Sequence, residues 1–163
     1  MLVRPVIRGG VPYAPLCWED FAILPGAASA VSEIRSAGFA VVVATNQPEV
    51  RRGNLSADLL AGFHSRLRDQ APVDAILSCC HDDQDACQCR KPKPGLILRG
   101  AEEQGIDLRK AWMVGDTERD QGAARAAGVP FLLIDAPYNK DLEAGVRIPD
   151  LAAAVHAILS GSV

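Results

Sequence analysis

FAVVVAT, residues 39–45, is a continuous apolar run rich in valine. A strand that is buried on both faces needs such a run, because neither of its faces meets water. The segment before it, residues 26–38, has the alanine-rich spacing of a helix and ends at a glycine, a common helix stop. Together the two segments predict a helix that leads into a buried strand of a parallel sheet.

The same alternation of helix and strand continues along the chain. After a polar loop at residues 45–55, Ser56 is suited to cap a helix that reaches about Gln70. Further strands are predicted at residues 73–79, 111–116 and 129–135, and further helices at 95–105, 117–128 and 149–159. The opening segment, to about Pro25, is rich in proline and glycine and is predicted to be loop. Alternating elements of this kind predict an α/β fold, a three-layer Rossmann-like parallel sheet with helices on both faces.

The composition is that of an ordinary globular protein. The chain has 163 residues, of which 48% are hydrophobic and 23% charged, and its net charge is −3. A mildly acidic chain argues against binding to nucleic acid or to a membrane surface, although a local group of cations still suits a small anionic ligand. The N-terminus does not have the pattern of a signal peptide, and no apolar run approaches the roughly 18 residues of a membrane span. We therefore expect one cytoplasmic domain over residues 1–163.

Polar residues stand where the predicted strands end. Thr45 and Asn46 end one strand, Asp116 ends another, and a loop of cysteine, arginine and lysine follows a third. Ligands of open parallel sheets bind at the carboxyl ends of the strands, so these residues mark the expected site. A threonine hydroxyl with adjacent N–H groups suits a phosphate oxygen, but Thr45-Asn46-Gln47 is also an ordinary turn sequence.

The loop SCCHDDQDACQCRKP, residues 78–92, concentrates possible metal ligands. Two pairs with one residue between their members give three thiolates and one imidazole, the closed tetrahedral set of structural zinc: Cys79, His81, Cys87 and Cys89. The alternatives are a disulfide or free thiols, and in a reducing compartment such clustering favours metal. Cys80 is expected to point away from this set, and Cys17 to be a small buried hydrophobic residue.

Arg90 and Lys91 follow the last of these cysteines directly. A lysine held by its neighbours presents a point charge to a phosphoryl group, and an arginine adds a forked contact. A solvated basic pair is the alternative. The metal loop on one side and Pro92 and Pro94 on the other favour a positioned role for both cations.

VGDTERD, residues 114–120, places Asp116 at a strand end and Asp120 in the first turn of the next helix. Carboxylates in this arrangement suit Mg²⁺. The alternative is that Asp116 or Thr117 only caps the helix. His64 and His156 lie within predicted helices, and we expect both to be structural.

Four segments together resemble one family in order and spacing: ILPGA (23–27), AGFAVVVATNQPEVRRG (37–53), CCH…CQCRKPKPG (79–95) and MVGDTERDQGAARAAG (113–128). They resemble the haloacid dehalogenase superfamily of phosphatases. The branch of D,D-heptose 1,7-bisphosphate phosphatases and histidinol-phosphate phosphatases is the most similar. The resemblance covers residues 1 to about 135, and the zinc loop joined to RKPxPG is its most specific part.

The resemblance implies an Mg²⁺-dependent phosphomonoesterase that acts on a small sugar phosphate through an aspartyl-phosphate. Thr45 would bind the transferring phosphoryl group, Lys91 would neutralise it, and Asp116 would bind Mg²⁺ with support from Asp120. The loop cysteines and His81 would bind Zn²⁺. Substrate would be held by five further residues: Asn46, Gln47, Arg52, Gly53 and Arg90.

One motif of this family is not found in the sequence. The family opens with an apolar strand ending in D-x-D-G, whose first aspartate attacks phosphorus and whose second is the general acid and base. Residues 1–4 and Pro12-Tyr13 match the elements that follow that motif, and no acid occurs before Glu19. The expected consequence is a sheet without its central strand, which belongs between the strands at 39–45 and 111–115.

Loss of that strand is costly, because each unpaired buried backbone group costs ~1–3 kcal/mol against a total stability of ~5–15 kcal/mol. A monomer would have to rearrange, or another chain would have to supply the strand. A misassigned start codon is the preferred explanation, since Met1 stands where the family often has valine. The alternative is a truncated relative that binds phosphosugars or a partner protein without catalysis, and histidinol phosphate or another phosphomonoester stays open as substrate.

Overall fold

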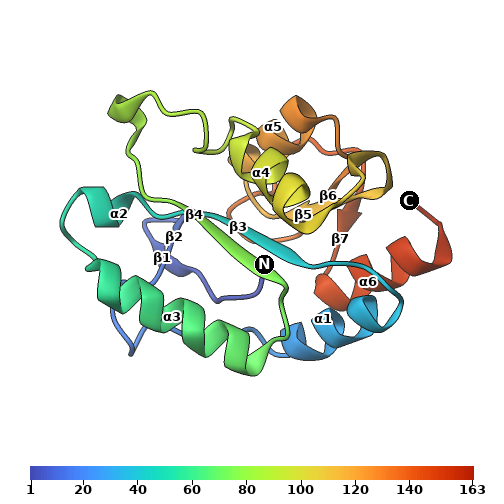
Figure 1. The fold of residues 1–163 in the computed structure, drawn as a ribbon, viewed down its shortest axis with the longest axis horizontal. Coiled ribbons are helices and arrows are strands. Elements are labelled where there is room, and N and C mark those ends of the chain that lie inside the picture. The colour runs from blue at the N-terminus through green and yellow to red at the C-terminus, as the bar shows by residue number, and fades with distance from the viewer.

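The computed structural model describes residues 1–163 and has strands between two groups of helices. On one side lie α1 (Ala27–Ser36), α3 (Ala57–Gln70) and α6 (Leu151–Ser160), and on the other α4 (Gly95–Gln104) and α5 (Glu118–Ala127) (Figure 1). Each helix expected from the sequence is present, and its bounds differ by a few residues at most. The Ser56 hydroxyl accepts a hydrogen bond from the Leu59 amide and caps α3 as predicted.

The strands form parallel pairs, which confirms the α/β fold. β3 (Val42–Asn46) pairs with β4 (Ala75–Cys79) in the register Val42 to Ala75. β5 (Met113–Gly115) pairs with β6 (Phe131–Ile134), and β6 pairs with β7 (Arg147–Ile148). The sequence did not indicate β7, because a two-residue strand carries no periodic signal.

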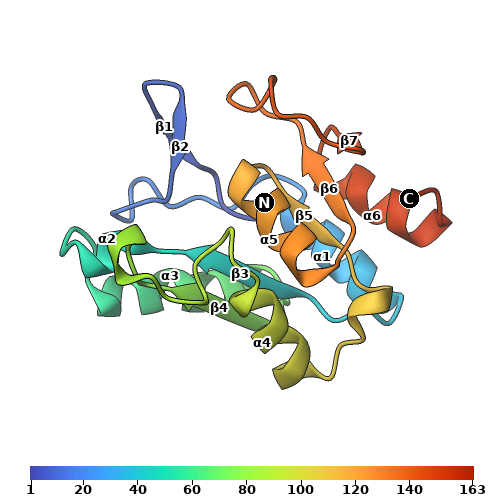
Figure 2. The ribbon, with the colours of Figure 1, turned by 90° about the horizontal axis from the view of Figure 1, so that it is seen from above.

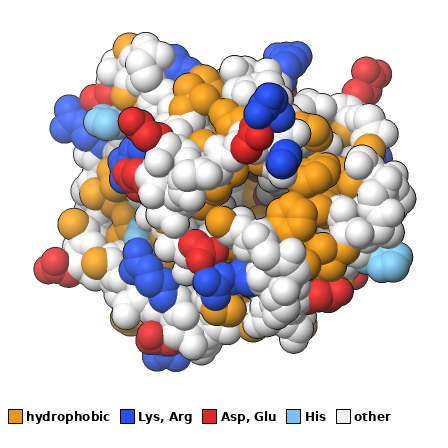
Figure 3. All heavy atoms as spheres, turned by 45° about the vertical axis from the view of Figure 1, so that its right-hand side comes forward, with side chains coloured by type: hydrophobic (Ala, Val, Ile, Leu, Met, Phe, Trp, Pro, Cys, Tyr) orange, Lys and Arg blue, Asp and Glu red, His pale blue; other side chains and the backbone are white.

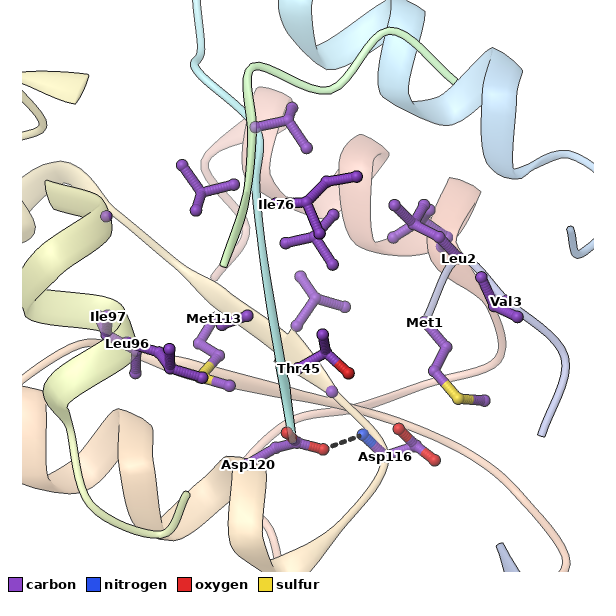
Figure 4. Close-up of a pocket in the computed structure, with 18 of the residues that line it drawn as sticks. Met1, Leu2, Val3, Thr45, Ile76, Leu96, Ile97, Met113, Asp116 and Asp120 are labelled. Carbon is purple, nitrogen blue, oxygen red and sulfur yellow. Dashed lines mark hydrogen bonds between the residues drawn. The ribbon is translucent and has the colours of Figure 1, made fainter. Parts of the chain in front are cut away.

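The sheet is divided where the central strand was expected to be absent. β3 is hydrogen bonded only to β4, and β5 only to β6 (Figure 2). A cavity of about 590 Å³ lies between them, with mainly apolar walls drawn from both strands and from the helices around them. Met1, Leu2 and Val3 also line this cavity (Figure 4). Thr45 and Asp116 both lie in its wall, so the carboxyl ends of β3 and β5 meet at one end of it.

The opening segment is not all loop, so that part of the prediction was wrong. β1 (Val6–Arg8) and β2 (Val11–Tyr13) form an antiparallel hairpin, which stands apart from the sheets in Figure 2. Its turn is Gly9-Gly10, with φ values of 56° and 80°. A two-residue turn with positive φ at both positions matches the twist of the strands, and glycine adopts it without steric cost.

Three short elements lie in segments that were expected to be loops. They are α2 (Pro48–Arg51) and the 3₁₀ turns η1 (Asp83–Asp85) and η2 (Leu108–Lys110). The core is a set of small clusters around the cavity, among them Ala30, Ile34 and Val155 between α1 and α6. None of the helices has the length and apolar character that a membrane span requires.

Candidate functional site

Lys91 occupies the polar end of the cavity and joins the two halves of the sheet. Its Nζ donates to the carbonyl oxygen of Ala44 at 2.7 Å and to Oδ1 of Asp120 at 2.5 Å. The side chain of Asn46 fixes the backbone of Lys91, because it donates to the Lys91 carbonyl and accepts from the Lys91 amide, both at 3.0 Å. The Lys91 side chain extends from the loop of residues 90–92 and places its ammonium group between β3 and α5.

Asp120 is buried, and its carboxylate shapes the turn that follows β5. Its Oδ2 accepts from the Thr117 hydroxyl at 2.6 Å and from the amides of Asp116 and Thr117. Burial acts to raise the pKa of Asp120, but Lys91 and these donors outweigh it and hold the pKa below its usual value. Gly115 is required here, because a Cβ at that position would lie 2.6 Å from the Cβ of Asp120.

Asp116 follows β5, and its carboxylate faces the cavity. The Tyr138 hydroxyl donates to its Oδ2 at 2.5 Å, and the Asn139 side chain donates to its carbonyl oxygen at 2.8 Å. Burial raises the pKa of Asp116, and the hydrogen bond from Tyr138 opposes this shift. The N-cap of α5 is Thr117, which forms a capping box with Asp120. The Asp116 carboxylate is thus not used as the cap.

Sequence reasoning missed Tyr138 and Asn139. Both follow β6, whose carboxyl end lies at the same edge of the sheet as the ends of β3 and β5. The rule that placed the site at the carboxyl ends of strands would have pointed to them, had it been applied to the strand predicted at residues 129–135.

Thr45 and Gln47 end β3 beside the cavity. The Thr45 side chain points into the cavity (Figure 4), and the Gln47 side-chain amide donates to the Thr45 hydroxyl at 3.1 Å. Oε1 of Gln47 is buried and has no hydrogen-bond partner. Unpaired buried acceptors are rare, so this oxygen is available to a donor that enters the cavity.

Four side chains of the loop after β4 converge on one point. The sulfur atoms of Cys79, Cys87 and Cys89 lie 3.0–3.6 Å apart, and Nδ1 of His81 lies 3.5 Å from Cys79 and 3.3 Å from Cys89. In a tetrahedral zinc site with bonds of ~2.0–2.3 Å, ligand atoms lie roughly 3.3–3.8 Å apart. The predicted set therefore has the composition and spacing of a metal site.

The remaining cysteines do not join this group. Cys80 packs against the cluster of Leu55, Leu60 and Phe63, which is consistent with the expectation that it points away. Every cysteine is free of disulfides, and Cys17 is only partly buried, so the expectation that it is a buried hydrophobic residue was wrong. Burial raises the pKa of the Cys79 thiol to about 12 when no ion is bound, so a metal would have to displace that proton.

Ion pairs fill the rim between the metal loop and the cavity. Arg52 donates to Asp82 and to Glu49 at 2.6 Å each, and neither Arg52 nor Gly53 lies in the cavity wall. Arg90 is buried and donates to Asp83 at 2.7 Å. The structure thus brings together Thr45, Asn46, Gln47, Lys91, Asp116 and Asp120, whereas it places Arg52, Gly53 and Arg90 around them.

The residues that meet at the cavity provide a cation, a hydroxyl and two carboxylates at the end of an apolar space. Figure 3 shows a hollow in one face of the molecule, with apolar side chains around it and charged ones at its edge. Such an arrangement suits an anion that enters together with a metal cation on the unpaired carboxylate, because electrostatic contacts are stronger where water is excluded.

Residues 11–128 match the model of the haloacid dehalogenase-like hydrolases. The chain belongs to this family. It is 36% identical over 152 residues to the D-glycero-β-D-manno-heptose-1,7-bisphosphate 7-phosphatase of Pseudomonas aeruginosa, with 86% of this chain and 85% of the relative covered. The enzyme of the same name from Bordetella bronchiseptica is 34% identical over 153 residues, with 86% of each chain covered.

Solved structures agree with this family assignment. The chain matches the crystal structure of D,D-heptose 1,7-bisphosphate phosphatase from B. bronchiseptica, complexed with magnesium and phosphate, with a TM-score of 0.79 and 31% identity. The match covers 88% of this chain and 87% of that one. A phosphatase described as haloacid dehalogenase-like from Mesorhizobium loti matches with a TM-score of 0.69 and 26% identity over 87% of this chain and 76% of that one.

Proposed function

We propose that this haloacid dehalogenase-like hydrolase binds D-glycero-D-manno-heptose 1,7-bisphosphate and removes its 7-phosphate. The observation that carries the proposal is Lys91, a nearly buried cation at the carboxyl ends of β3 and β5. The names of relatives at 32–36% identity over most of the chain supply the substrate.

Each cavity residue has a role in this proposal. Lys91 offsets the negative charge of the phosphoryl group, while the Thr45 hydroxyl donates to one of its oxygens. The side chain of Asn46 holds the backbone of Lys91, and the side chain of Gln47 holds the Thr45 hydroxyl, so the two groups keep a fixed position. Arg90 fastens two parts of the metal loop to each other through its ion pair with Asp83.

Two metal ions fit the residues present. Asp116 offers a carboxylate oxygen to Mg²⁺, the kind of ligand that this ion prefers. Bound Mg²⁺ would supply electrostatic stabilisation of the phosphoryl oxygens. The three thiols and His81 fit Zn²⁺ in a closed site, which stabilises the loop carrying Arg90 and Lys91 and has no open position for chemistry.

A second candidate function is phosphosugar binding without turnover. Both cavity carboxylates are already engaged: Asp120 pairs with Lys91, and Asp116 accepts from Tyr138. Asp120 is thereby occupied, and the only other acid in the cavity wall is Asp116, the proposed Mg²⁺ ligand, which is the observation behind this second candidate. Turnover therefore decides between the two candidates.

The test is to titrate the heptose bisphosphate into the protein with Mg²⁺ present, by calorimetry, and to measure phosphate release in the same samples. Saturable binding that Lys91→Met abolishes supports the site, and Lys140→Met is the matched control on an exposed lysine. Absence of binding would refute the proposal. Phosphate release by the 163-residue chain would exclude the second candidate.

A further inference from the structure

A bisphosphate from which one phosphate is removed keeps the other, and this retained group needs a binding site of its own. This inference rests on the proposed function, which places Lys91 and Thr45 at the reacting phosphate. The retained phosphate then requires cations elsewhere on the cavity rim, because Lys91 is already shared between Ala44 and Asp120.

Two guanidinium groups converge at one point of that rim. Arg90 reaches Asp83 with distances of 2.7 and 3.5 Å, and Arg119 reaches the same carboxylate with distances of 3.1 and 3.4 Å. Each arginine contacts both oxygens of Asp83. The carboxylate therefore occupies a position in which an oxyanion is bound between two forked donors.

The two arginines differ in how freely they can move to a ligand. The Arg90 side chain is only 9% exposed, whereas the Arg119 side chain is 47% exposed. Arg119 lies in the first turn of α5, beside Asp120, and is the one of the pair that lines the cavity. Arg52 is a weaker candidate, because two carboxylates hold it and it lies outside the cavity wall.

We propose that Arg119 binds the retained phosphate of a bisphosphorylated sugar, with Asp83 as its partner when no ligand is bound. Arg119 can leave Asp83 at little cost, because exposed ion pairs contribute little and Asp83 keeps its closer partner Arg90. A phosphate carries more charge than a carboxylate, so the exchange favours the ligand. Arg119 would thus determine the preference for bisphosphates over monophosphates.

The experiment compares two probes, D-glycero-D-manno-heptose 1,7-bisphosphate and the corresponding 7-phosphate. Their dissociation constants are measured by calorimetry with Mg²⁺, and KM takes the place of Kd if the chain hydrolyses them. We expect the protein to bind the bisphosphate about 10- to 100-fold more tightly, the range for charge-assisted hydrogen bonds to one further anion.

Arg119→Gln should remove most of that preference while it leaves the affinity for the 7-phosphate within about twofold. Arg119→Lys keeps the charge but loses the fork, so an intermediate preference is expected. Asp83→Asn should strengthen bisphosphate binding, because it removes the internal competitor. Arg125→Gln, on the exposed last turn of the same helix, is the matched control for a lost positive charge.

The outcomes separate this inference from the proposed function. If neither probe binds, the proposed function fails and the inference falls with it. If both probes bind equally well, or if Arg119→Gln keeps the full preference, the phosphatase site stands and Arg119 is not its second anion contact. If Arg125→Gln lost the preference for the bisphosphate to the same extent, the effect would come from the net charge of the protein, and this result would also overturn the inference.

Discussion

Replacement of Lys91 by methionine should destabilise the protein as well as weaken phosphate binding. The Lys91 and Asp120 side chains are 12% and 7% exposed, so the substitution leaves a buried carboxylate without its cation. Loss of one partner from a buried pair costs about 3–5 kcal/mol. Asp120 keeps its donors from Thr117 and the Asp116 amide, which favours the lower end, about 3 kcal/mol. The melting temperature should then fall by roughly 6–12 °C.

The loss of stability in Lys91→Met should depend on pH. With Lys91 present, the pKa of Asp120 in the folded protein lies below its usual value. The ion pair therefore stabilises the fold at pH values above the usual pKa of aspartate. This stabilisation is lost as the pH falls through the pKa of Asp120 in the folded protein. In Lys91→Met, burial is no longer opposed by the cation, and the folded pKa of Asp120 rises. The mutational loss should therefore be largest near neutral pH and shrink as the pH falls toward about 4.

Urea unfolding followed by tryptophan fluorescence measures the free energy of unfolding across this range. Lys140→Met should change it little, because Lys140 is exposed. Asp120→Asn in the Lys91→Met background removes the unpaired charge and should recover part of the loss. A loss below about 1 kcal/mol would contradict the reasoning, since exposed pairs give values of that size. A loss that grows at acid pH would contradict it as well.

Three further substitutions test other parts of the site. Gly115→Ala should lower the free energy of unfolding by about 1–3 kcal/mol in urea titrations, because its methyl group meets Asp120 at 2.6 Å. Cys89→Ser should lose bound zinc, measured as metal per chain, whereas Cys80→Ser should keep it; a full zinc complement in Cys89→Ser would remove Cys89 from the ligand set. Tyr138→Phe removes a donor from the carboxylate at the end of β5, so the pKa of Asp116 should rise, which NMR titration of the carboxyl group measures.

Local sequence patterns predicted most of the helices and strands, and they also predicted the residues at the polar end of the cavity. Apolar runs located β3 and β4, and the capping pattern located the start of α3. Once the strands are parallel, their carboxyl ends must meet, so Thr45 and Asp116 could be placed together without coordinates. The metal loop followed from ligand spacing alone, because both ligand pairs lie within eleven residues.

Contacts between separate loops could not be predicted in this way. The pairing of Asp83 with both Arg90 and Arg119 depends on how η1 and α5 approach each other, and neither segment carries a periodic signal for that approach. The Gly9-Gly10 hairpin is a different case. Its turn signal is present in the sequence, but strands of three residues are too short to show alternation, and the prolines nearby suggested loop.

The division of the sheet gives Lys91 two tasks at once. No backbone hydrogen bonds join β3 to β5, so the carboxyl ends of the two half-sheets are held by side chains, and Lys91 reaches from the Ala44 carbonyl on β3 to Asp120 on α5. The same ammonium group is the cation that a phosphoryl group would meet. A variant at this position that fails to bind phosphate is therefore ambiguous until its stability is known. The double substitution with Asp120→Asn resolves the ambiguity, because it restores charge balance without restoring the cation.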